Sequence, residues 1–379
     1  MSEHRFSTPF GEFELLPLHH HPRSPLQAWN AADEFLLQEL AAQPPAPDAR
    51  VLVVNDHNGA LATALHQWHP HSWNDAFTAQ LALQQNLNRN GLASTAVDFI
   101  AASTPLPVAY DVVLLQLPKT LSLLEYQLLQ LRQHIHPKTQ IMAGGMIKHM
   151  PPSMTALFEK IIGPSRTSLA QKKARLIVSN FNPESNPGAV KSPRYGIDNS
   201  PLQLVNHANV FSQQKLDIGT RFLLTHFPDL SAADSILDLG CGNGALGIYA
   251  GWKHPAATLH FVDDSFMAIK SAQDSVQLNE LKNPVHFYND DGLTHFSGGV
   301  DAILCNPPFH EGNKVHTDIA ARMFRDAARH LTANGTLYVV ANRHLEYRPL
   351  LQPLFQSIRQ LQANNKFVIL AASGSRRRV

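Results

Sequence analysis

The stretch "ILDLGCGNGALGIYAGWKHP", residues 236–255, decides the fold. Its beginning is an apolar run of strand length, and its end, "ALGIYAGWKH", has the composition of a helix. Gly240, Gly242 and Gly244 lie between the two and permit positive φ and a close approach of the backbone to a ligand. A strand, a glycine-rich turn and a helix in this order predict an α/β sheet that binds a nucleotide-like group at the carboxyl end of the strand.

The same alternation continues to the C-terminus and predicts a mostly parallel sheet. We expect Gly335 to end the last long helix as a C-terminal glycine. The expected elements after the glycine turn are the strands 258–264, 284–290, 300–306, 335–342 and 366–373, and the helices 266–281 and 320–332.

An internal repeat shows that the first half has the same plan. The stretch "VLVVNDHNGALATALHQWHP" (51–70) aligns without a gap on residues 236–255, so that Asn58-Gly59-Ala60-Leu61 falls on Asn243-Gly244-Ala245-Leu246. Further on, "DVVLLQLPK" (111–119) falls on "DAILCNPPF" (301–309). Two matches in the same order predict a duplication. In the first half we expect strands at 50–56 and 110–117 and a helix at 121–135.

A segment rich in Pro, Asn, Ser and Gly, residues 179–201, separates the halves. It reads as a linker or as a short hairpin that opens the second domain. We place the domains at 1–185 and 186–379, with an uncertainty of about ten residues because boundaries are poorly read from one sequence.

The composition excludes several classes of protein. The 379 residues are 44% hydrophobic and 16% charged, with a formal net charge of +1, so an RNA or DNA partner would need a local basic patch. Cys241 and Cys305 are the two cysteines, which excludes a disulfide framework. The N-terminus does not read as a signal peptide, no apolar run spans a membrane, and the histidines, such as those in "LHHHP" (18–22), lack metal-ligand spacing. These features predict a soluble cytoplasmic protein without a metal.

Two cofactors compete for the glycine turn. Gly240 and Gly242 with Ala245 can be read as a dinucleotide fingerprint, with Asp263 at the distance of a ribose ligand. Asp238, however, would repel a pyrophosphate and suits a cofactor with an amino group and a sulfonium, S-adenosylmethionine. A plain turn between strand and helix is the third alternative.

Two pairs of carboxylates follow the next two strands. Asp263 or Asp264 can accept both ribose hydroxyls, and strand alternation does not decide between them. Asp290 and Asp291 are similarly placed for an adenine amine. Either pair could instead belong to a solvated loop.

The sequence "ILCNPPFHEG" (303–312) ends the fourth strand with two prolines that cannot donate to a sheet. A nucleobase amine is a poor nucleophile because its lone pair is delocalised into the ring. Two uncharged acceptors that hold its hydrogens would favour a pyramidal nitrogen, and we expect Asn306 Oδ1 and the Pro307 carbonyl to be those acceptors. Pro308 stiffens the turn and Phe309 can stack on the base, so that transfer depends on positioning more than on a strong base.

The glycine turn together with "NPPF" resembles the class I, Rossmann-like methyltransferases that modify exocyclic amines. More narrowly, the chain resembles the bacterial ribosomal RNA guanine-N2 methyltransferases, and among them the large-subunit (23S) enzymes. The narrower resemblance rests on "NVFSQQKLDIGTRFLL" (209–224), "CNPPFH" and "VVANRHLEY" (339–347), and the large-subunit branch on "PLQAWNAADEFLL" (25–37), "KKARLI" (172–177) and "NNKFVIL" (364–370).

This resemblance implies a fold, a reaction and a set of residues. The fold would be two tandem Rossmann-like domains with mostly parallel seven-stranded sheets, of which only the second is active. The enzyme would be a monomer that transfers a methyl group from S-adenosylmethionine to the N2 amine of a guanine in 23S ribosomal RNA. The residues implied to hold the cofactor are Asp238, Gly240, Cys241, Gly242, Gly244, Asp263 and Asp290, with Phe211, Asp217 and Gly219 at its methionine end; Asn306, Pro307, Pro308 and Phe309 would hold the guanine.

The first half departs from this pattern at the site. Asn55-Asp56-His57 replaces Gly240-Cys241-Gly242, Val53 replaces Asp238, and Gln116-Leu117 replaces Asn306-Pro307. We therefore expect no cofactor there and a role in recruiting RNA. A basic cluster is formed in sequence by Arg166, Lys172, Lys173 and Arg175, and the terminal "SRRRV" is also basic; both could contact phosphates or be solvated surface.

Other functions remain compatible with these residues. They are a 16S guanine-N2 methyltransferase, an adenine-N6 or glutamine-N5 methyltransferase, a non-catalytic RNA-binding assembly factor and an NAD-dependent oxidoreductase. The intact Gly240, Gly242 and Asn306 argue against the assembly factor.

Overall fold

The computed structural model describes residues 4–21, 26–308 and 314–376, without the side chains of 314–317. The chain divides into two compact units, Met1–Lys191 and Ser192–Val379. The division lies inside the predicted linker, and a two-stranded hairpin soon follows it, as one of the two readings of that segment expected. This hairpin consists of β10 (Arg194–Gly196) and β11 (Gln203–Val205).

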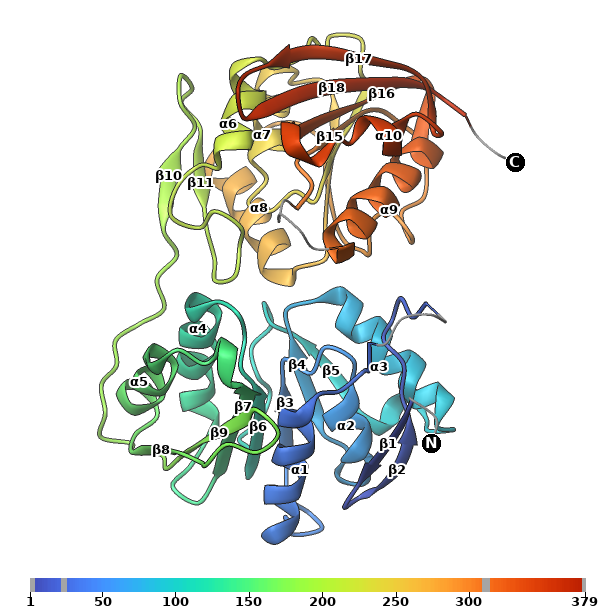
Figure 1. Ribbon diagram of the computed structural model, residues 1–379. Helices are drawn as coiled ribbons and strands as arrows, with labels where there is room; N and C mark the ends of the chain where they lie inside the picture. Colours follow the sequence, from blue (N-terminus) through green and yellow to red (C-terminus); the bar gives the residue numbers. More distant parts are fainter. Residues whose placement is uncertain (1–3, 22–25, 309–313, 377–379) are drawn as a thin grey trace. The chain divides into compact units, whose positions relative to one another are not determined.

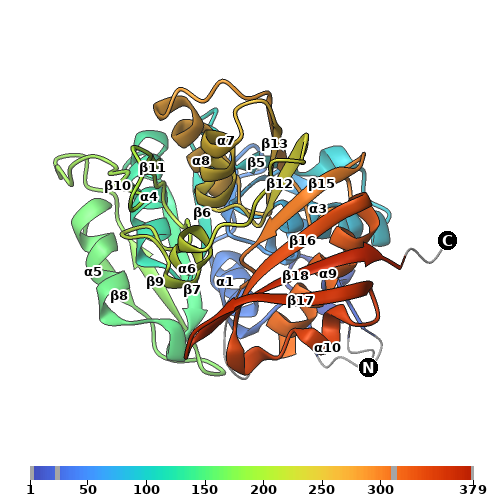
Figure 2. The same cartoon turned by 90° about the horizontal axis from the view of Figure 1, so that it is seen from above.

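The C-terminal unit is built on a seven-stranded sheet with the order β14-β13-β12-β15-β16-β18-β17. Neighbouring strands from β14 to β16 pair in parallel, and β18 pairs antiparallel with β16 and β17; Figure 2 shows these last three strands side by side. The strands are β12 (Ser235–Leu239), β13 (Thr258–Asp263), β14 (Val285–Asn289), β15 (Val300–Cys305), β16 (Leu331–Asn342), β17 (Phe355–Ala363) and β18 (Phe367–Ser375). The helices are α6 (Ile218–Thr225), α7 (Ala245–Lys253), α8 (Phe266–Leu278), α9 (Lys314–His330) and α10 (Arg348–Leu351), with the short η5 (Arg343–Leu345).

Strand alternation gives this sheet two apolar faces. In β15, Ala302 and Leu304 belong to the core that includes residues of α6, α7 and α8, and Ile303 and Cys305 to the core that includes residues of α9 and α10. The ribbon view shows the helices on the two sides of the sheet (Figure 1). A strand buried on both faces has to be apolar throughout, which is why "AILC" reads as a continuous run.

The N-terminal unit has the same topology. Its sheet has the order β5-β4-β3-β6-β7-β9-β8, which repeats the C-terminal order strand for strand. The register agrees as well, because Val51 pairs with Val112 where Ile236 pairs with Ala302. This confirms the internal match that the sequence predicts.

The elements of the N-terminal unit follow one another as they do in the second half, beginning with a hairpin of β1 (Arg5–Thr8) and β2 (Gly11–Glu14) where the C-terminal unit has β10 and β11. The sheet strands are β3 (Val51–Val54), β4 (His71–Asn74), β5 (Asp98–Ala101), β6 (Val112–Gln116), β7 (Gln140–Met146), β8 (Ser165–Thr167) and β9 (Ala174–Ser179). The helices are α1 (Ala31–Ala42), α2 (Ala60–Ala64), η1 (His66–Trp68), α3 (Phe77–Arg89), η2 (Ser94–Ala96), α4 (Leu121–Leu131), η3 (Arg132–His134), η4 (Ile147–His149) and α5 (Pro152–Ile161).

The prediction for Gly335 is wrong. Helix α9 ends at His330 and β16 begins at Leu331, so Gly335 lies inside a strand. Its φ is not positive, but a Cβ there would lie 2.9 Å from Leu331 Cδ2 and 3.0 Å from the Val300 carbonyl oxygen. Glycine is required for this close packing rather than for a helix end.

Within the described ranges, no helix combines the length and the apolar composition that crossing a membrane requires.

Candidate active site

The glycine turn between β12 and α7 has the expected backbone. Gly240, Gly242 and Gly244 have φ values of +70°, +54° and +82°, a region that side-chain-bearing residues rarely adopt. A Cβ on Gly244 would meet Ile248 and Ala272 at 3.1 and 3.2 Å, whereas a Cβ on Gly242 would meet no described atom within 4 Å. Gly244 is therefore demanded by packing, and Gly242 borders open space.

Asp238 lies at the end of the buried β12 and is 2% exposed. Its Oδ2 accepts a hydrogen bond from the backbone N–H of Gly247, 2.8 Å away, which ties the strand to the first turn of α7. Burial raises the pKa of Asp238 to about 8. A carboxyl group in such a position is stabilised in its charged form by a cation.

Asp263, at the end of β13, reaches back to the same turn. Its Oδ2 accepts from Gly242 N–H at 2.8 Å and its Oδ1 from Ser265 N–H at 2.9 Å. These bonds place the carboxylate of Asp263, rather than that of Asp264, against the glycine turn. The backbone of Asp264 also donates to this carboxylate, which leaves one of its four lone pairs for a ligand hydroxyl.

The carboxylate of Asp290 accepts more hydrogen bonds from the protein than its position in the sequence suggests. Its two oxygens accept four hydrogen bonds, from the backbone of Asp291, His295 and Phe296 and from His295 Nδ1, at 2.8 to 3.0 Å. A carboxylate with four donors has little capacity left for an adenine amine. Asp290 thus shapes the loop after β14, and Asp291 becomes the better candidate of the pair.

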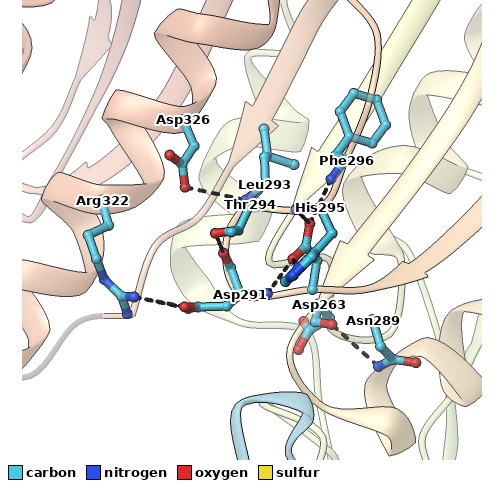
Figure 3. A network of polar contacts seen from close by, with 10 residues as sticks. Asp263, Asn289, Asp291, Leu293, Thr294, His295, Phe296, Arg322 and Asp326 are labelled. Atoms are coloured by element: carbon cyan, nitrogen blue, oxygen red, sulfur yellow. Dashed lines mark hydrogen bonds and ion pairs between the residues drawn. The ribbon is translucent and has the colours of Figure 1, made fainter. Parts of the chain in front are cut away.

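Asp291 is joined to α9 by Arg322, whose Nη1 lies 3.1 and 3.0 Å from the two carboxylate oxygens (Figure 3). Asp326, one turn further along α9, accepts from Leu293 N–H. Neither of these α9 residues is predicted from the sequence. Their i, i+4 spacing signals a common helix face, but nothing in the sequence names the loop that the face meets.

Asn306 follows β15 immediately, and the nitrogen of its side-chain amide is hydrogen-bonded while the oxygen is not bonded to any described residue. Its Nδ2 donates to Asp217 Oδ2 at 3.0 Å and to Thr220 Oγ1 at 2.8 Å. Its Oδ1 is shielded from solvent and has no donor within the described part of the chain. An unpaired buried acceptor costs about 1–3 kcal/mol and is rare in folded proteins, so this oxygen marks a site that a ligand completes.

The remaining residues predicted for the site differ in burial and position. Pro307 is buried and Pro308 exposed, while Phe309 lies outside the described residues. Cys241 is buried, and burial raises the pKa of its thiol. Asp217 and Gly219 belong to the start of α6 beside Asn306, whereas Phe211 is 61% exposed on the preceding turn.

The corresponding place in the N-terminal unit is filled by side chains. Asn55, with φ +60°, stands where Gly240 stands in the second half, and its amide forms a reciprocal pair with that of Gln127 at 2.9 and 2.7 Å. Gln116, in the place of Asn306, donates to the buried Asp33 at 2.6 Å. This network supports the prediction that no cofactor binds there.

The predicted basic cluster is only partly exposed. Arg166, Lys172 and Lys173 are exposed and Arg175 is half-buried. Both lysines form the two-residue turn between β8 and β9, with φ values of +47° and +65°, the geometry that closes a tight hairpin. Of the terminal "SRRRV", only Ser375 and Arg376 are described.

The hairpin turn lies at the carboxyl end of β7, because Ala174 pairs with Met146. Lys148 follows β7 and Lys119 follows β6, and both are exposed. Four lysines therefore gather at the edge of this sheet that corresponds to the cofactor-binding edge of the other half.

Comparisons with known proteins agree with this architecture. Residues 3–183 match the family model "RLMG N-terminal domain", and residues 201–371 match "Methyltransferase small domain". The chain is 44% identical over 372 residues to the ribosomal RNA large subunit methyltransferase G of Pseudomonas aeruginosa, covering 97% of this chain and 99% of the relative. It is 45% identical over 369 residues to the protein of the same name from Pseudomonas putida, covering 97% and 98%.

A solved structure has the same two-domain fold. It is the T. thermophilus 16S rRNA N2 G1207 methyltransferase, determined in complex with AdoMet and guanosine. The TM-score is 0.76 at 19% identity, and the superposition covers 97% of each chain.

Proposed function

Because the chain belongs to the family of the ribosomal RNA large subunit methyltransferase G, we propose that it transfers a methyl group from S-adenosylmethionine to the N2 amine of a guanine in 23S ribosomal RNA. The observation that carries the proposal is the Asn306 amide, whose nitrogen has two acceptors while its oxygen has no donor among the residues that the structure describes. Such an oxygen is suited to accept a hydrogen from a planar amine. The proposed enzyme acts as a monomer in the cytoplasm.

The residues of the glycine turn fit this cofactor. Gly242 borders open space, so the backbone can approach a ligand closely. Asp238 supplies a buried carboxyl group for a positive amino group, and Asp263 keeps a lone pair for a ribose hydroxyl. Asp291, held by Arg322, would receive the adenine amine. When bound, S-adenosylmethionine supplies an electrophilic methyl carbon attached to a sulfonium.

The chain's own residues position the amine for that carbon. Asn306 Oδ1 and the Pro307 carbonyl would accept the two amine hydrogens and favour a nitrogen whose lone pair points out of the base plane. Neither acceptor is basic enough to keep the proton. As the N–C bond forms and the S–C bond breaks, the amine proton would therefore pass to solvent. Positioning rather than strong base catalysis carries the rate.

The direct test uses labelled S-adenosylmethionine with naked 23S RNA, naked 16S RNA and isolated ribosomal subunits. We expect label in N2-methylguanosine from the 23S substrate. Label in 16S RNA alone would assign the enzyme to the small subunit. Label in N6-methyladenosine, in protein only, or in no product would overturn the proposal.

Cofactor binding is expected to depend on pH through Asp238. With a pKa of about 8 this carboxyl is largely protonated in the free protein at neutral pH, and a cationic ligand selects the charged form. The affinity for S-adenosylmethionine should therefore rise about tenfold per pH unit below that pKa and level off above it. Isothermal titration at pH 6.5 and 7.5 in two buffers of different ionisation enthalpy would measure both the affinity and the released proton.

Asp238→Asn is the control for this pH dependence. An asparagine oxygen can still accept from Gly247 N–H, so the tie between β12 and α7 remains while the titrating group is lost. The variant should bind more weakly and without proton release. An identical pH profile in the two proteins would remove Asp238 from cofactor binding.

We further propose that the N-terminal unit binds RNA phosphates through the lysines at the carboxyl edge of its sheet. Lys172→Glu combined with Lys173→Glu should weaken binding and reduce the salt slope by about 1–2, since each phosphate contact contributes about 0.7–0.9. Fluorescence anisotropy with a 23S fragment at several salt concentrations measures both quantities.

The matched control is Lys138→Glu with Lys160→Glu. These two lysines are also exposed, and the double variant makes the same change in net charge; Lys138 lies at the amino end of β7, on the opposite edge of the sheet. An equal loss in both double variants would show that net charge rather than the carboxyl edge governs binding.

A further inference from the structure

We propose that Asp217 and Thr220 are positioning residues that fix the orientation of the Asn306 amide, so that its oxygen and not its nitrogen faces the substrate amine. The inference rests on the proposed function, because it assigns roles within the same site. Sequence resemblance associates Asp217 with the methionine end of the cofactor, whereas its contacts in the structure are with Asn306 and with its own helix.

The contacts form a closed triangle. Asn306 Nδ2 donates to Asp217 Oδ2 at 3.0 Å and to Thr220 Oγ1 at 2.8 Å, and Thr220 N–H donates to the same Asp217 oxygen at 2.8 Å. Both hydrogens of the amide nitrogen thus have an acceptor. The oxygen, pointing the other way, has none among the described residues.

The two partners contribute differently to this orientation. A hydroxyl can donate as well as accept, so Thr220 alone would tolerate either orientation of the amide. A carboxylate only accepts, so a flipped amide would bring its oxygen against Asp217 with no proton between them. Asp217 therefore selects the orientation, and Thr220 holds the second hydrogen in place.

The geometry of the start of α6 explains why Asp217 and Thr220 are three residues apart in the sequence. Asp217 is the N-cap of α6 and Thr220 its third residue, which is the spacing at which an N-cap side chain accepts from the backbone. Gly219 lies between them, and a Cβ there would approach Asp217 Oδ2 to 3.0 Å and Phe367 to 3.3 Å. Gly219 is thus required by this arrangement, whatever it contributes to the cofactor.

The N-terminal unit has a related tie between strand end and helix start. Asn30 is the N-cap of α1, and Asp33, the third residue of that helix, receives Gln116 Nε2 at 2.6 Å. A side-chain amide therefore joins the strand end to the helix start in both halves. Among the described residues, the amide nitrogen has two acceptors in the second half and one in the first.

The test compares three threonine variants. Thr220→Val removes the hydroxyl at nearly constant shape, Thr220→Ser restores it, and Thr225→Val makes the same change in the last turn of α6, where the hydroxyl donates to Arg221. We expect Thr220→Val to lower kcat about tenfold with the cofactor Kd and the KM for RNA almost unchanged, since misplacing a reacting group mainly reduces the chemical step. Thr220→Ser should restore most of kcat, and Thr225→Val should behave as wild type.

Asp217→Ser tests the selection of orientation. Serine is an equally good N-cap, so α6 should still form, but its hydroxyl can donate as well as accept and therefore no longer excludes the flipped Asn306. We expect a fall in kcat of about tenfold, again without a matching change in cofactor affinity.

A second measurement does not require turnover. In protein labelled with ¹⁵N-asparagine, the side-chain NH₂ of Asn306 should exchange slowly with solvent in the wild type and in Thr225→Val, and faster in Thr220→Val and Asp217→Ser. If the wild type methylates guanine but Thr220→Val keeps its kcat, the inference is wrong and the proposed function stands. If the wild type methylates no guanine, the proposed function is wrong; unchanged exchange of the NH₂ in the variants would then refute the inference on its own.

Discussion

Asn306→Ala is expected to lower methyl transfer to guanine by about 10²- to 10³-fold while the Kd for S-adenosylmethionine stays within about threefold of wild type. The substitution removes the side-chain acceptor that we assign at the end of β15. Two carboxylates that we assign to the cofactor have their own hydrogen bonds and do not depend on Asn306: Asp238 is tied to the first turn of α7 and Asp263 to the glycine turn. Single-turnover kinetics with saturating RNA, together with calorimetric cofactor titration, would separate the two quantities.

Gln116→Ala is the matched control for this prediction, because Gln116 occupies the equivalent strand end in the N-terminal unit. Its amide donates to the buried Asp33, so its removal should lower the stability of that unit without lowering turnover per folded molecule. Thermal unfolding followed by circular dichroism would report the stability of both variants. An Asn306→Ala enzyme with normal turnover would show that the amine needs no acceptor from this side chain.

Gly242→Ala should weaken cofactor binding about 10- to 100-fold while leaving a folded protein, since a misplaced methyl group costs about 1–3 kcal/mol. The added Cβ meets no described atom within 4 Å, so the described residues oppose it only through the left-handed φ of +54° at this position. The methyl group would instead occupy the space above the turn in which we place the cofactor. Equilibrium binding of S-adenosylmethionine measures the effect.

Gly91→Ala separates backbone strain from the loss of the binding space. Gly91 also has a left-handed φ, +67°, and a Cβ there would also meet nothing within 4 Å, but it lies on a turn of the N-terminal unit after α3. Both variants should lose a similar stability of about 1 kcal/mol from the strained backbone. If they also bound the cofactor equally well, the glycine turn would not contact it.

The sequence predicted those features that depend on neighbouring residues. The strand before Gly240, the helix after it and the acceptor at Asn306 each follow from a short run with a clear period or a proline break. The duplication was visible because it repeats such a run, "NGAL", at the same turn in both halves. The register of β3 with β6 and of β12 with β15 then confirmed it.

Contacts between distant segments could not be predicted in this way. Thr220 and Asn306 are 86 residues apart, and a threonine in the first turn of a helix has many ordinary roles. The four donors around Asp290 come from a loop whose path no periodicity fixes. Strand β17 escaped prediction because most of its side chains are exposed at the edge of the sheet, which removes the alternation that reveals a strand.

Because the two halves of the chain have the same topology, their comparison separates residues required for folding from residues required for the reaction. Gly59 and Gly244 occupy equivalent turns, both have left-handed φ, and a Cβ on either would crowd the next helix, at 2.7 Å from Leu83 Cδ1 in the first half and 3.2 Å from Ala272 in the second. This glycine is present in both halves, so the architecture alone requires it. His57 stands where Gly242 stands in the second half, and no described atom would crowd a Cβ on Gly242. Packing therefore does not demand Gly242, which agrees with the ligand role that we propose for it, and the comparison of the two halves distinguishes a glycine needed for folding from one proposed to serve binding.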